Sequence, residues 1–320
     1  MQDTLGRKIN YLRVSVTDLC NLRCMYCMPA HGVCKKDHDS ILRIEEIAEI
    51  VKAAVELGIN KVRLTGGEPL VRKGILDLVG EIGSIEAIKD FSMTTNGVLL
   101  KKYAQALKAA GLHRVNISLD TLNAEKYKYI TRGGHLQDVL DGIAEAKRVG
   151  LLPLKINVVL IGGFNDDEIT DFVELTLQEE VEIRFIELMP VGEASTWAKT
   201  HFLSNETVLE KFPDLVPEIT NDKSSPAKYF KLPQSKGRVG LINPISNHFC
   251  GACNRLRVTA DGKIKPCLHA NAEIDIRKLL AAGKTLTDIL AAAILQKPAG
   301  HKLNDPNFEP IERNMYQIGG

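Results

Sequence analysis

Between residues 10 and 189 the chain alternates strand-like and helix-like segments in tandem. The strand candidates are rich in Val, Ile and Leu and cover residues 11–17, 61–65, 90–94, 114–119, 154–161 and 182–188. Helical periodicity falls between them, at residues 44–57, 75–82, 100–110, 136–149 and 168–177. Strand–helix units in tandem predict an α/β fold with a parallel sheet covered by helices. Periodicity alone leaves open whether this sheet is flat and doubly wound or curled into a partial (β/α)6 barrel.

The alternation stops at Met189 and Pro190. Residues 191–250 are rich in Gly, Pro, Asn and Ser, and we expect loops there. Residues 255–265 predict a β-hairpin with Asp261-Gly262 as its turn, and a helical region follows at 276–295. We therefore expect two parts, a partial barrel over residues 5–190 and a C-terminal region over residues 191–320.

The composition excludes some classes of protein. The 320 residues carry 41 basic and 40 acidic side chains, and we expect no nucleic-acid partner because such binding needs a basic excess. No apolar run approaches the roughly 20 residues of a membrane span, and the N-terminus lacks the pattern of a signal peptide. We expect no membrane association and a cytoplasmic location. Seven cysteines in such a chain indicate metal or redox chemistry rather than disulfides.

Three cysteines, Cys20, Cys24 and Cys27, follow the first expected strand with spacings of three and two residues. Three thiolates in a compact loop can ligate a [4Fe–4S] cluster and leave one iron open. An open coordination position lets a metal centre bind a substrate. The alternative is a zinc site completed by Cys34, His31 or His38, and Cys34 is otherwise expected to be a loop thiol.

A second trio, Cys250, Cys253 and Cys267, lies near the C-terminus, and the expected hairpin can fold Cys267 back towards Cys253. Structural zinc completed by His248 or His269 is the alternative here. Arg255 and Arg257 share one face of the adjoining strand, and guanidinium groups suit phosphate oxygens. A solvated basic face would be the ordinary explanation. Beside a second open cluster, an anionic substrate such as a nucleoside triphosphate explains the arginines better.

These motifs resemble those of known proteins. The first trio with Tyr26, and Thr65-Gly66-Gly67-Glu68-Pro69 after the second strand, resemble signatures of the radical S-adenosylmethionine (SAM) superfamily. Arg13-x-Ser-x-Thr-Asp-x-Cys20, the second trio with Asn254-Arg-Leu-Arg257, and the Gly319-Gly320 end resemble the molybdenum cofactor biosynthesis protein A family over residues 5–320. The resemblance implies an incomplete (β/α)6 TIM-like barrel with a C-terminal extension that carries a second iron–sulfur cluster.

The resemblance also implies an activity. Electron transfer to the first cluster cleaves SAM, and the resulting 5′-deoxyadenosyl radical abstracts hydrogen from C3′ of GTP. The C3′ radical then attacks C8, giving 3′,8-cyclo-7,8-dihydro-GTP in the first step of molybdenum cofactor (molybdopterin) biosynthesis. The implied cofactors are two [4Fe–4S] clusters and SAM. The implied partners are GTP, a flavodoxin- or ferredoxin-like electron donor, cyclic pyranopterin monophosphate synthase as the next enzyme, and a second copy in a homodimer.

Site residues carried over by position form four groups. The first cluster is assigned to Cys20, Cys24 and Cys27, and the second to Cys250, Cys253 and Cys267. SAM contacts are assigned to Tyr26, Gly67, Ser118 and Met189. GTP contacts are assigned to Arg13, Arg63, Thr94, Lys155, Arg255, Leu256 and Arg257. Catalytic roles are assigned to Arg13, Arg255, Arg257, Gly319 and Gly320.

The residues themselves support part of this assignment. Gly67, Thr94, Ser118 and Met189 lie at or just beyond the C-terminal ends of expected strands, where barrels place their chemistry. Lys155 is expected to share a strand face with Asn157, and a buried Lys needs an anion; an exposed strand start is an equal alternative.

Two other functions remain open. The first is a radical SAM peptide-modifying enzyme with an auxiliary cluster, although such enzymes usually have more C-terminal cysteines. The second is a non-catalytic zinc protein, which metal analysis would distinguish from an iron enzyme.

Overall fold

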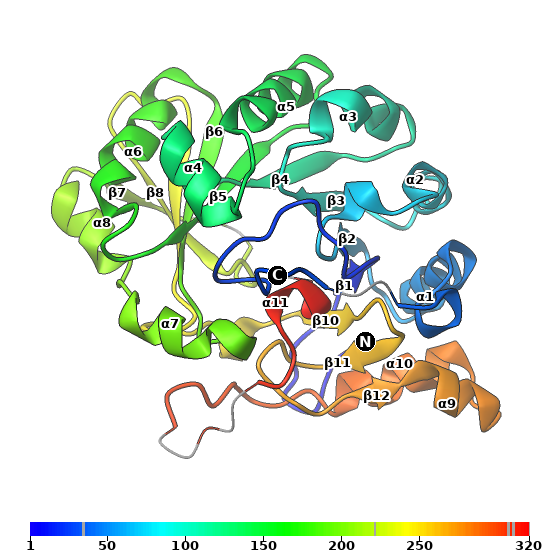
Figure 1. Cartoon of the computed structure of the whole chain (residues 1–320). Coiled ribbons are helices and arrows are strands. Elements are labelled where there is room, and N and C mark those ends of the chain that lie inside the picture. The colour runs from blue at the N-terminus through cyan, green and yellow to red at the C-terminus, as the bar shows by residue number, and fades with distance from the viewer. Residues whose placement is uncertain (34–35, 221, 306–307, 309–310, 320) are drawn as a thin grey trace.

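One twelve-stranded sheet organises the computed structural model, which describes residues 1–33, 36–220, 222–305, 308 and 311–319. Its strand order is β12-β11-β10-β1-β2-β3-β4-β5-β6-β9-β8-β7. The six central strands run parallel in chain order: β1 (Tyr11–Ser15), β2 (Lys61–Thr65), β3 (Asp90–Thr95), β4 (Arg114–Ser118), β5 (Leu154–Leu160) and β6 (Val181–Glu187). Within the described residues the end strands β12 and β7 are not paired with each other, so the sheet forms an incomplete barrel (Figure 1).

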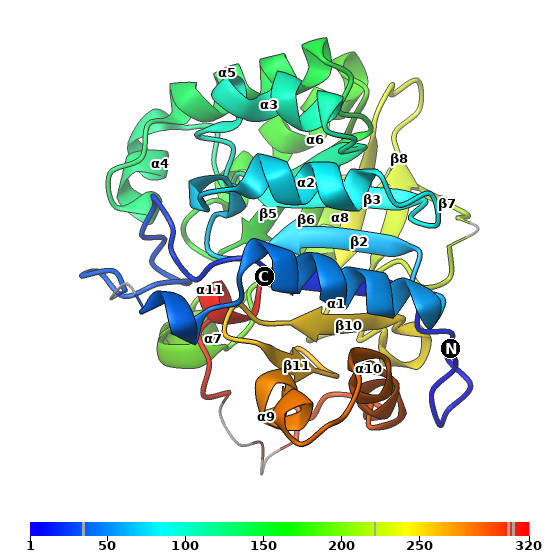
Figure 2. The same ribbon diagram turned by 90° about the vertical axis from the view of Figure 1, so that its right-hand side faces the viewer.

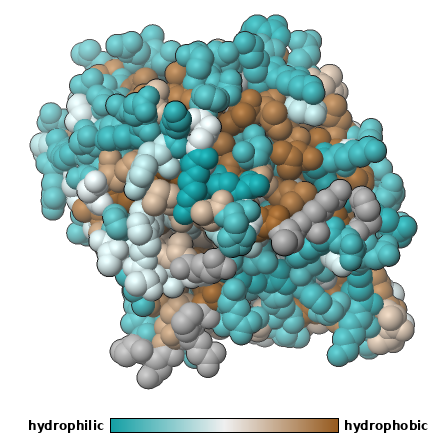
Figure 3. Space-filling view, in the orientation of Figure 1, coloured by the Kyte–Doolittle hydropathy of each residue, from teal (hydrophilic) through white to brown (hydrophobic). Residues whose placement is uncertain are grey.

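Helices cover the outer face of this sheet in both ribbon views (Figures 1 and 2). They are α1 (Ile44–Glu56), α2 (Ile75–Gly83), α3 (Leu100–Ala109), α4 (Ala124–Thr131), α5 (Leu136–Arg148) and α6 (Ile169–Gln178). Ile47, Ile50 and Val51 of α1 are buried against the strands, whereas Glu45 and Glu49 lie on its outer side. This is the apolar stripe that helical periodicity predicts. The face in Figure 3 is accordingly hydrophilic over most of the outer helices.

The expected strands and helices are confirmed to within two residues at either end, and the structure adds α4. Short 3-10 helices occur at His38–Ser40, Pro69–Val71, Asp166–Glu168, Gly192–Ala194 and Cys250–Ala252. None of the helices in the described part of the chain is long and apolar enough to cross a membrane.

The expectation of loops over residues 191–250 is wrong. This region forms α7 (Ser195–Thr200), α8 (Glu206–Lys211), β7 (Val216–Glu218), β8 (Ala227–Lys231) and β9 (Arg238–Ile242). β9 pairs parallel with β6, and β8 pairs antiparallel with β9. Each element is too short to show clear periodicity among its Gly and Pro residues. β9 pairs with β6, which lies far away in sequence, so a tertiary contact stabilises this short antiparallel unit, which local sequence does not predict.

The expected hairpin is confirmed as β10 (Arg255–Val258) and β11 (Lys263–Lys265), with Gly262 at φ +78° in the turn. β12 (Ile274–Asp275) follows. The expected helical region 276–295 is two helices, α9 (Ile276–Ala281) and α10 (Leu286–Leu295), because Gly283 at φ +81° ends the first. A last short helix, α11 (Met315–Ile318), lies beneath the N-terminal cysteine loop in Figure 1.

β10 decides the geometry of the site. It pairs parallel with β1, with Arg257 opposite Arg13. Cys20 follows the C-terminal end of β1, whereas Cys253 precedes the N-terminal end of β10. The two cysteine trios are therefore placed towards opposite ends of one parallel strand pair.

Candidate active site

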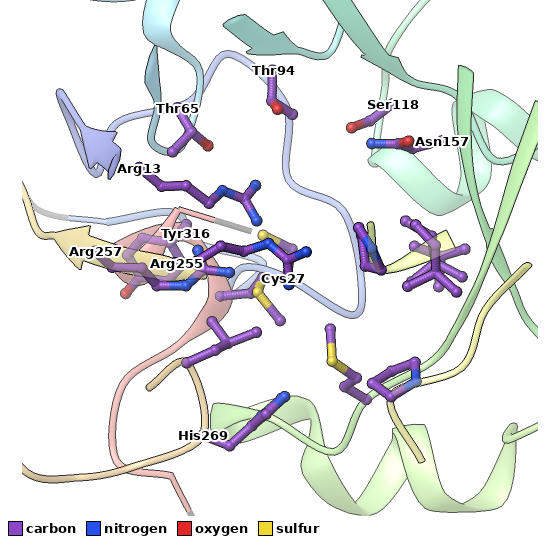
Figure 4. A pocket seen from close by; sticks show the side chains of 18 of the residues that line it. Arg13, Cys27, Thr65, Thr94, Ser118, Asn157, Arg255, Arg257, His269 and Tyr316 are labelled. Atoms are coloured by element: carbon purple, nitrogen blue, oxygen red, sulfur yellow. The ribbon is translucent and has the colours of Figure 1, made fainter. Parts of the chain in front are cut away.

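All six predicted ligand cysteines line one cavity of about 320 Å³. Most of the other predicted site residues line it too: Arg13, Tyr26, Arg63, Gly67, Thr94, Ser118, Met189, Arg255 and Arg257. Figure 4 shows Arg13, Arg255 and Arg257 close to Cys27 and Tyr316, with Thr94, Ser118 and Asn157 along the strand side of the cavity. The structure thus brings together residues that are separated by more than 250 positions in sequence.

The Gly66-Gly67 pair places the end of β2 directly on the first cysteine loop. The Gly67 amide donates to the Thr17 carbonyl at 2.8 Å, and the Glu68 amide donates to the Leu19 carbonyl at 2.8 Å. A Cβ atom on Gly67 would lie 2.4 Å from the Leu19 carbonyl oxygen. Only glycine permits this approach, and Leu19 is the residue directly before Cys20.

Glu68 connects this contact to the end of β3. Its carboxylate is fully buried and accepts hydrogen bonds from the Leu70 amide (3.0 Å), the Thr95 hydroxyl (2.8 Å) and the Asn96 amide (2.7 Å). Burial raises the pKa of Glu68 to about 7, although these hydrogen bonds oppose the rise. Asn96 in turn donates from Nδ2 towards the Cys20 sulfur at 3.6 Å. Sequence reasoning missed Asn96, because nothing in its neighbourhood marks it as a partner of Cys20.

Tyr26 is fixed by a buried carboxylate. Its hydroxyl donates to Asp120 Oδ2 at 2.6 Å, and Asp120 Oδ1 accepts from the Val159 amide at 2.9 Å. Burial raises the pKa of Asp120 to about 6. Tyr26 thus contributes to the same cavity wall as Ser118, at the end of β4, and Met189, after β6.

The first trio fits an iron–sulfur cluster by its donor chemistry. Burial, together with the neighbouring thiols, raises the pKa of Cys27 to about 12 and the pKa of Cys24 well above its usual value. Three thiolates cannot be held here without a cationic group to offset this cost. Three cysteines from one loop that face a cavity are the ligand set of a [4Fe–4S] cluster with one open iron.

The second trio is assembled from two segments. Cys250 is the first residue of a short 3-10 helix, and Cys253 directly follows that helix. Cys267 comes from the other segment, two residues after the end of β11. Of the two histidines considered as zinc ligands, His269 is buried and lines the cavity, whereas His248 is exposed. Nδ1 of His269 has no hydrogen-bond partner among the described residues. The second trio therefore lines the cavity together with His269, whose Nδ1 atom is buried.

A second cavity of about 360 Å³ adjoins the first and shares Arg13, Arg63, Arg184 and Arg255 with it. Eight cationic side chains line this second cavity, whereas its only carboxylates are those of Asp90 and Asp222 among the described residues. Besides the four shared arginines, the cations are Lys61, Arg114, Lys155 and Arg238. Burial lowers the pKa of both Arg13 and Arg63 to about 9. This excess of positive charge would suit a polyanion.

Lys155 lines the second cavity and not the first. It has an anion of its own, because its Nζ lies 2.5 Å from Oε2 of Glu182 on β6. Glu182 also accepts from Arg184 (3.0 Å), Arg238 (2.7 Å) and Tyr229 (3.0 Å). One carboxylate therefore faces three cations, and positive charge remains in excess. Sequence reasoning missed Glu182 and Arg184, although their alternation on β6 matches that of Lys155 and Asn157 on β5.

Three buried polar atoms in the lining of the first cavity lack hydrogen-bond partners among the described residues. They are Thr94 Oγ1, Asn157 Oδ1 and Arg184 Nε. All three residues line the first cavity, and Arg184 lines both. Buried polar atoms are normally paired, so these atoms indicate a ligand with several polar groups.

The C-terminal tail enters the site. The backbone amide of Tyr316 donates to the Cys27 sulfur, and Arg257 Nη1 donates to the Gly319 carbonyl at 2.6 Å. Gly319 has φ +67°, and a Cβ atom there would lie 2.5 Å from Thr65 Cγ2. Gly319 therefore lies behind the cavity wall, held by Arg257. Gly320 and Cys34 lie outside the described residues.

Leu256 is the one predicted contact whose side chain faces away. Residues alternate along β10, so Arg255 and Arg257 face the cavity while Leu256 is buried in the hydrophobic core at 1% exposure. Any contact of Leu256 with a nucleotide is therefore a backbone contact.

Comparisons with known proteins agree with this geometry. Two family models match the chain, the radical SAM superfamily over residues 14–176 and Molybdenum Cofactor Synthesis C over residues 181–303. GTP 3′,8-cyclase from Alkaliphilus oremlandii is 60% identical over 100% of both chains, and that from Alkaliphilus metalliredigens is 56% identical over 100% of both. The chain belongs to the GTP 3′,8-cyclase family. As a radical SAM protein, it uses SAM and a [4Fe–4S] cluster.

Solved structures share the fold. SuiB from Streptococcus suis, bound to S-adenosylmethionine, aligns with a TM-score of 0.62 at 15% identity and covers 89% of this chain and 66% of that one. The enzyme anSMEcpe with bound AdoMet aligns with a TM-score of 0.58 at 15% identity and covers 92% and 79%. At this identity the similarity supports the incomplete barrel and nothing more specific.

A substitution at Gly67 tests the close approach of β2 to the cysteine loop. We expect Gly67→Ala to lower the free energy of unfolding by roughly 1–3 kcal/mol, because backbone must move to relieve the clash with Leu19. SAM binding should weaken with it. Urea unfolding and equilibrium dialysis with SAM measure the two effects. Gly80→Ala on α2 is the matched control, since a Cβ atom there meets nothing within 4 Å; equal effects of the two substitutions would contradict the assigned role.

Proposed function

We propose that this chain converts GTP to 3′,8-cyclo-7,8-dihydro-GTP, the first step of molybdenum cofactor biosynthesis, with two [4Fe–4S] clusters and SAM as cofactors. One observation carries the proposal: a single cavity is lined by two cysteine trios and adjoins a second cavity with eight cationic side chains. A site built only for SAM needs one trio. A site that holds a nucleoside triphosphate beside two metal centres needs both cysteine trios and the cationic cavity.

The first trio and its neighbours form the SAM side of the site. Cys20, Cys24 and Cys27 are the cluster ligands, and Tyr26, Gly67, Ser118 and Met189 are the SAM contacts. When bound, the cluster and SAM supply the organic radical that removes hydrogen from the substrate. The chain positions the reactants and excludes water, since the cavity lies inside the barrel, against Tyr26 and the buried carboxylate of Asp120 that holds it.

GTP is placed with its triphosphate in the cationic cavity and its base towards the second trio, Cys250, Cys253 and Cys267. Arg63, Lys155 and Arg184 face the phosphates from the strands, and Arg13 lines both cavities. Thr94 Oγ1 and Asn157 Oδ1, which lack partners among the described residues, lie where ribose hydroxyls would satisfy them. Arg255, the Leu256 backbone and Arg257 complete the nucleotide contacts. Arg13, Arg255, Arg257, Gly319 and Gly320 are the proposed catalytic group.

Product analysis tests the function. Protein reconstituted with iron and sulfide under anaerobic conditions is incubated with GTP, SAM and a reductant. We expect 5′-deoxyadenosine and a cyclised nucleotide in equal amounts. 5′-Deoxyadenosine without any nucleotide product would contradict the proposal that GTP is the substrate. A colourless protein that holds zinc and no iron would contradict the proposal that the chain is a radical SAM enzyme.

Lys155 predicts a proton linkage in GTP binding. Burial and the nearby Arg184 lower the pKa of Lys155 to about 7, although Glu182 opposes them. In the free protein the ammonium form is therefore lost as pH rises through about 7. A bound triphosphate raises that pKa, so binding takes up a proton above pH 7 and GTP affinity falls by up to about tenfold per pH unit.

Calorimetry in two buffers of different ionisation enthalpy counts this proton. Lys155→Met should bind GTP more weakly, with a pH dependence that lacks the decline of the wild type above pH 7. The γ-phosphate titrates identically in both proteins, so the difference between them isolates Lys155. Identical pH profiles would show that Lys155 does not contact the phosphates.

Other proposals rest on the family alone. We propose a flavodoxin- or ferredoxin-like electron donor, a homodimer, a cytoplasmic location, and cyclic pyranopterin monophosphate synthase as the enzyme that takes up the product. We also propose that residues 5–190 form a radical SAM part and residues 191–320 a C-terminal part. This division describes function and not separate folding units, because one sheet contains strands from both parts.

A further inference from the structure

The N-terminal segment ends in a buried ion pair that the proposed reaction does not use. Asp3 and Arg7 are 6% and 9% exposed, and Asp3 Oδ2 accepts from Arg7 Nε at 2.6 Å. Asp3 Oδ1 accepts from the amides of Leu5 (3.0 Å) and Arg7 (2.9 Å). In Figures 1 and 2 this end of the chain lies beside β10 and α10. The carboxylate therefore fixes the Arg7 guanidinium in one orientation.

The remaining donors of Arg7 all reach the neighbourhood of the second trio. Nη1 donates to the carbonyls of Cys250 (2.9 Å) and Ala299 (3.2 Å), and Nη2 donates to those of Lys297 (3.3 Å) and Pro298 (2.7 Å). A guanidinium has five N–H donors, and here all five have acceptors. Arg7 thus joins the Cys250 backbone to the turn that follows α10.

Lys297, in that turn, reaches the other two cysteines. It is 5% exposed, and its Nζ donates to the carbonyls of Arg255 (2.8 Å) and Pro266 (2.7 Å). It also hydrogen-bonds to the Cys253 side chain. Pro266 directly precedes Cys267. An ammonium has three donors, so Lys297 is also fully used.

The two cations therefore hold three segments that are remote in sequence. Arg7 contacts the Cys250 segment, Lys297 contacts the Cys253 and Cys267 segments, and the Lys297 carbonyl accepts from Arg7. The turn also lies next to the first cysteine of the trio, since a Cβ atom on Gly300 would be in ordinary van der Waals contact with the Cys250 sulfur, at 3.8 Å. Six backbone carbonyls in all point at these two side chains, and removing either leaves buried acceptors unpaired.

We propose that Arg7, oriented by Asp3, and Lys297 are positioning residues of the second metal centre. They hold its three cysteines in ligating positions, and Lys297 also places a positive charge beside its sulfurs. This inference rests on the proposed function, which puts a cluster on Cys250, Cys253 and Cys267. Residues outside the ligand sphere that orient ligands commonly change metal affinity by about 10–100-fold.

The test isolates the second centre. In a background with Cys20, Cys24 and Cys27 all replaced by Ser, about four irons per chain should remain after reconstitution. In that background we expect Lys297→Met and Arg7→Met to release iron to a chelator at least about tenfold faster. Lys297→Met should also make the reduction potential more negative, because loss of a nearby cation disfavours the reduced cluster. Lys297→Arg, which keeps the charge, should restore the potential.

Two controls separate the outcomes. Lys284→Met, at an exposed lysine between α9 and α10, should behave like the background protein. The same variants in the intact chain should still cleave SAM, which shows that they fold. Unchanged iron release and reduction potential in Lys297→Met and Arg7→Met would overturn the positioning role of these two residues. The proposal of a second cluster would not be affected by that result. A triple-serine background that binds no iron would instead overturn the second cluster itself, and this inference with it.

Discussion

Replacing Cys24 by Ser should reduce SAM cleavage to the level of a chain without a cluster. Cys24 lies between Cys20 and Cys27 in the loop, and all three sulfurs line the cavity. A [4Fe–4S] cluster with one open iron needs all three thiolates, and a serine hydroxyl ionises far too weakly to replace one. The measurement is 5′-deoxyadenosine formed under anaerobic conditions with reductant, with or without GTP.

Cys267→Ser is the matched control for this result. It removes one thiolate from the second trio and leaves the first loop intact. We expect it to retain SAM cleavage while the cyclised nucleotide disappears. If Cys24→Ser still produced 5′-deoxyadenosine at the rate of the wild type, the first trio would not be the site of SAM chemistry.

Arg257→Ala should raise the Kd for GTP by roughly 10–100-fold, the loss expected for a charge-assisted hydrogen bond of about 1.5–3 kcal/mol. Arg257 is 7% exposed and lines the cavity, and burial together with Arg255 lowers the pKa of Arg257 to about 10. It is still charged at neutral pH and held in place for an anion. Equilibrium dialysis with GTP measures the change.

The tail complicates this result, because Arg257 also holds the Gly319 carbonyl. Deleting Gly319 and Gly320 separates the two roles: it should lower turnover and leave GTP affinity near that of the wild type. Arg148→Ala, at an exposed arginine on α5 that pairs with Glu145, is the control for loss of charge. An unchanged Kd in Arg257→Ala would remove its role in nucleotide binding, and full turnover after the deletion would remove that of the glycines.

Local sequence carried most of the site chemistry. The spacing of Cys20, Cys24 and Cys27 restricts them to one loop, so their proximity needed no tertiary information. Gly67 was predictable for the same reason, since a Gly-Gly pair after a strand permits a close backbone approach. The six parallel strands were equally readable, because apolar residues alternate with polar ones along most of them and a helix separates each strand from the next.

Tertiary structure decided what lies far apart in sequence. That β10 pairs with β1, opposite Arg13, follows from burial across the whole sheet and not from any property of residues 255–258. The same long-range packing places Glu182 beside Lys155 and the Arg7 guanidinium on the Cys250 carbonyl. Sequence by itself therefore determined which ligands and cations this chain possesses and which strands it forms. Only the folded sheet decided which of them face one another, because hydrophobic burial is non-directional and specific pairing arises where distant segments are packed together.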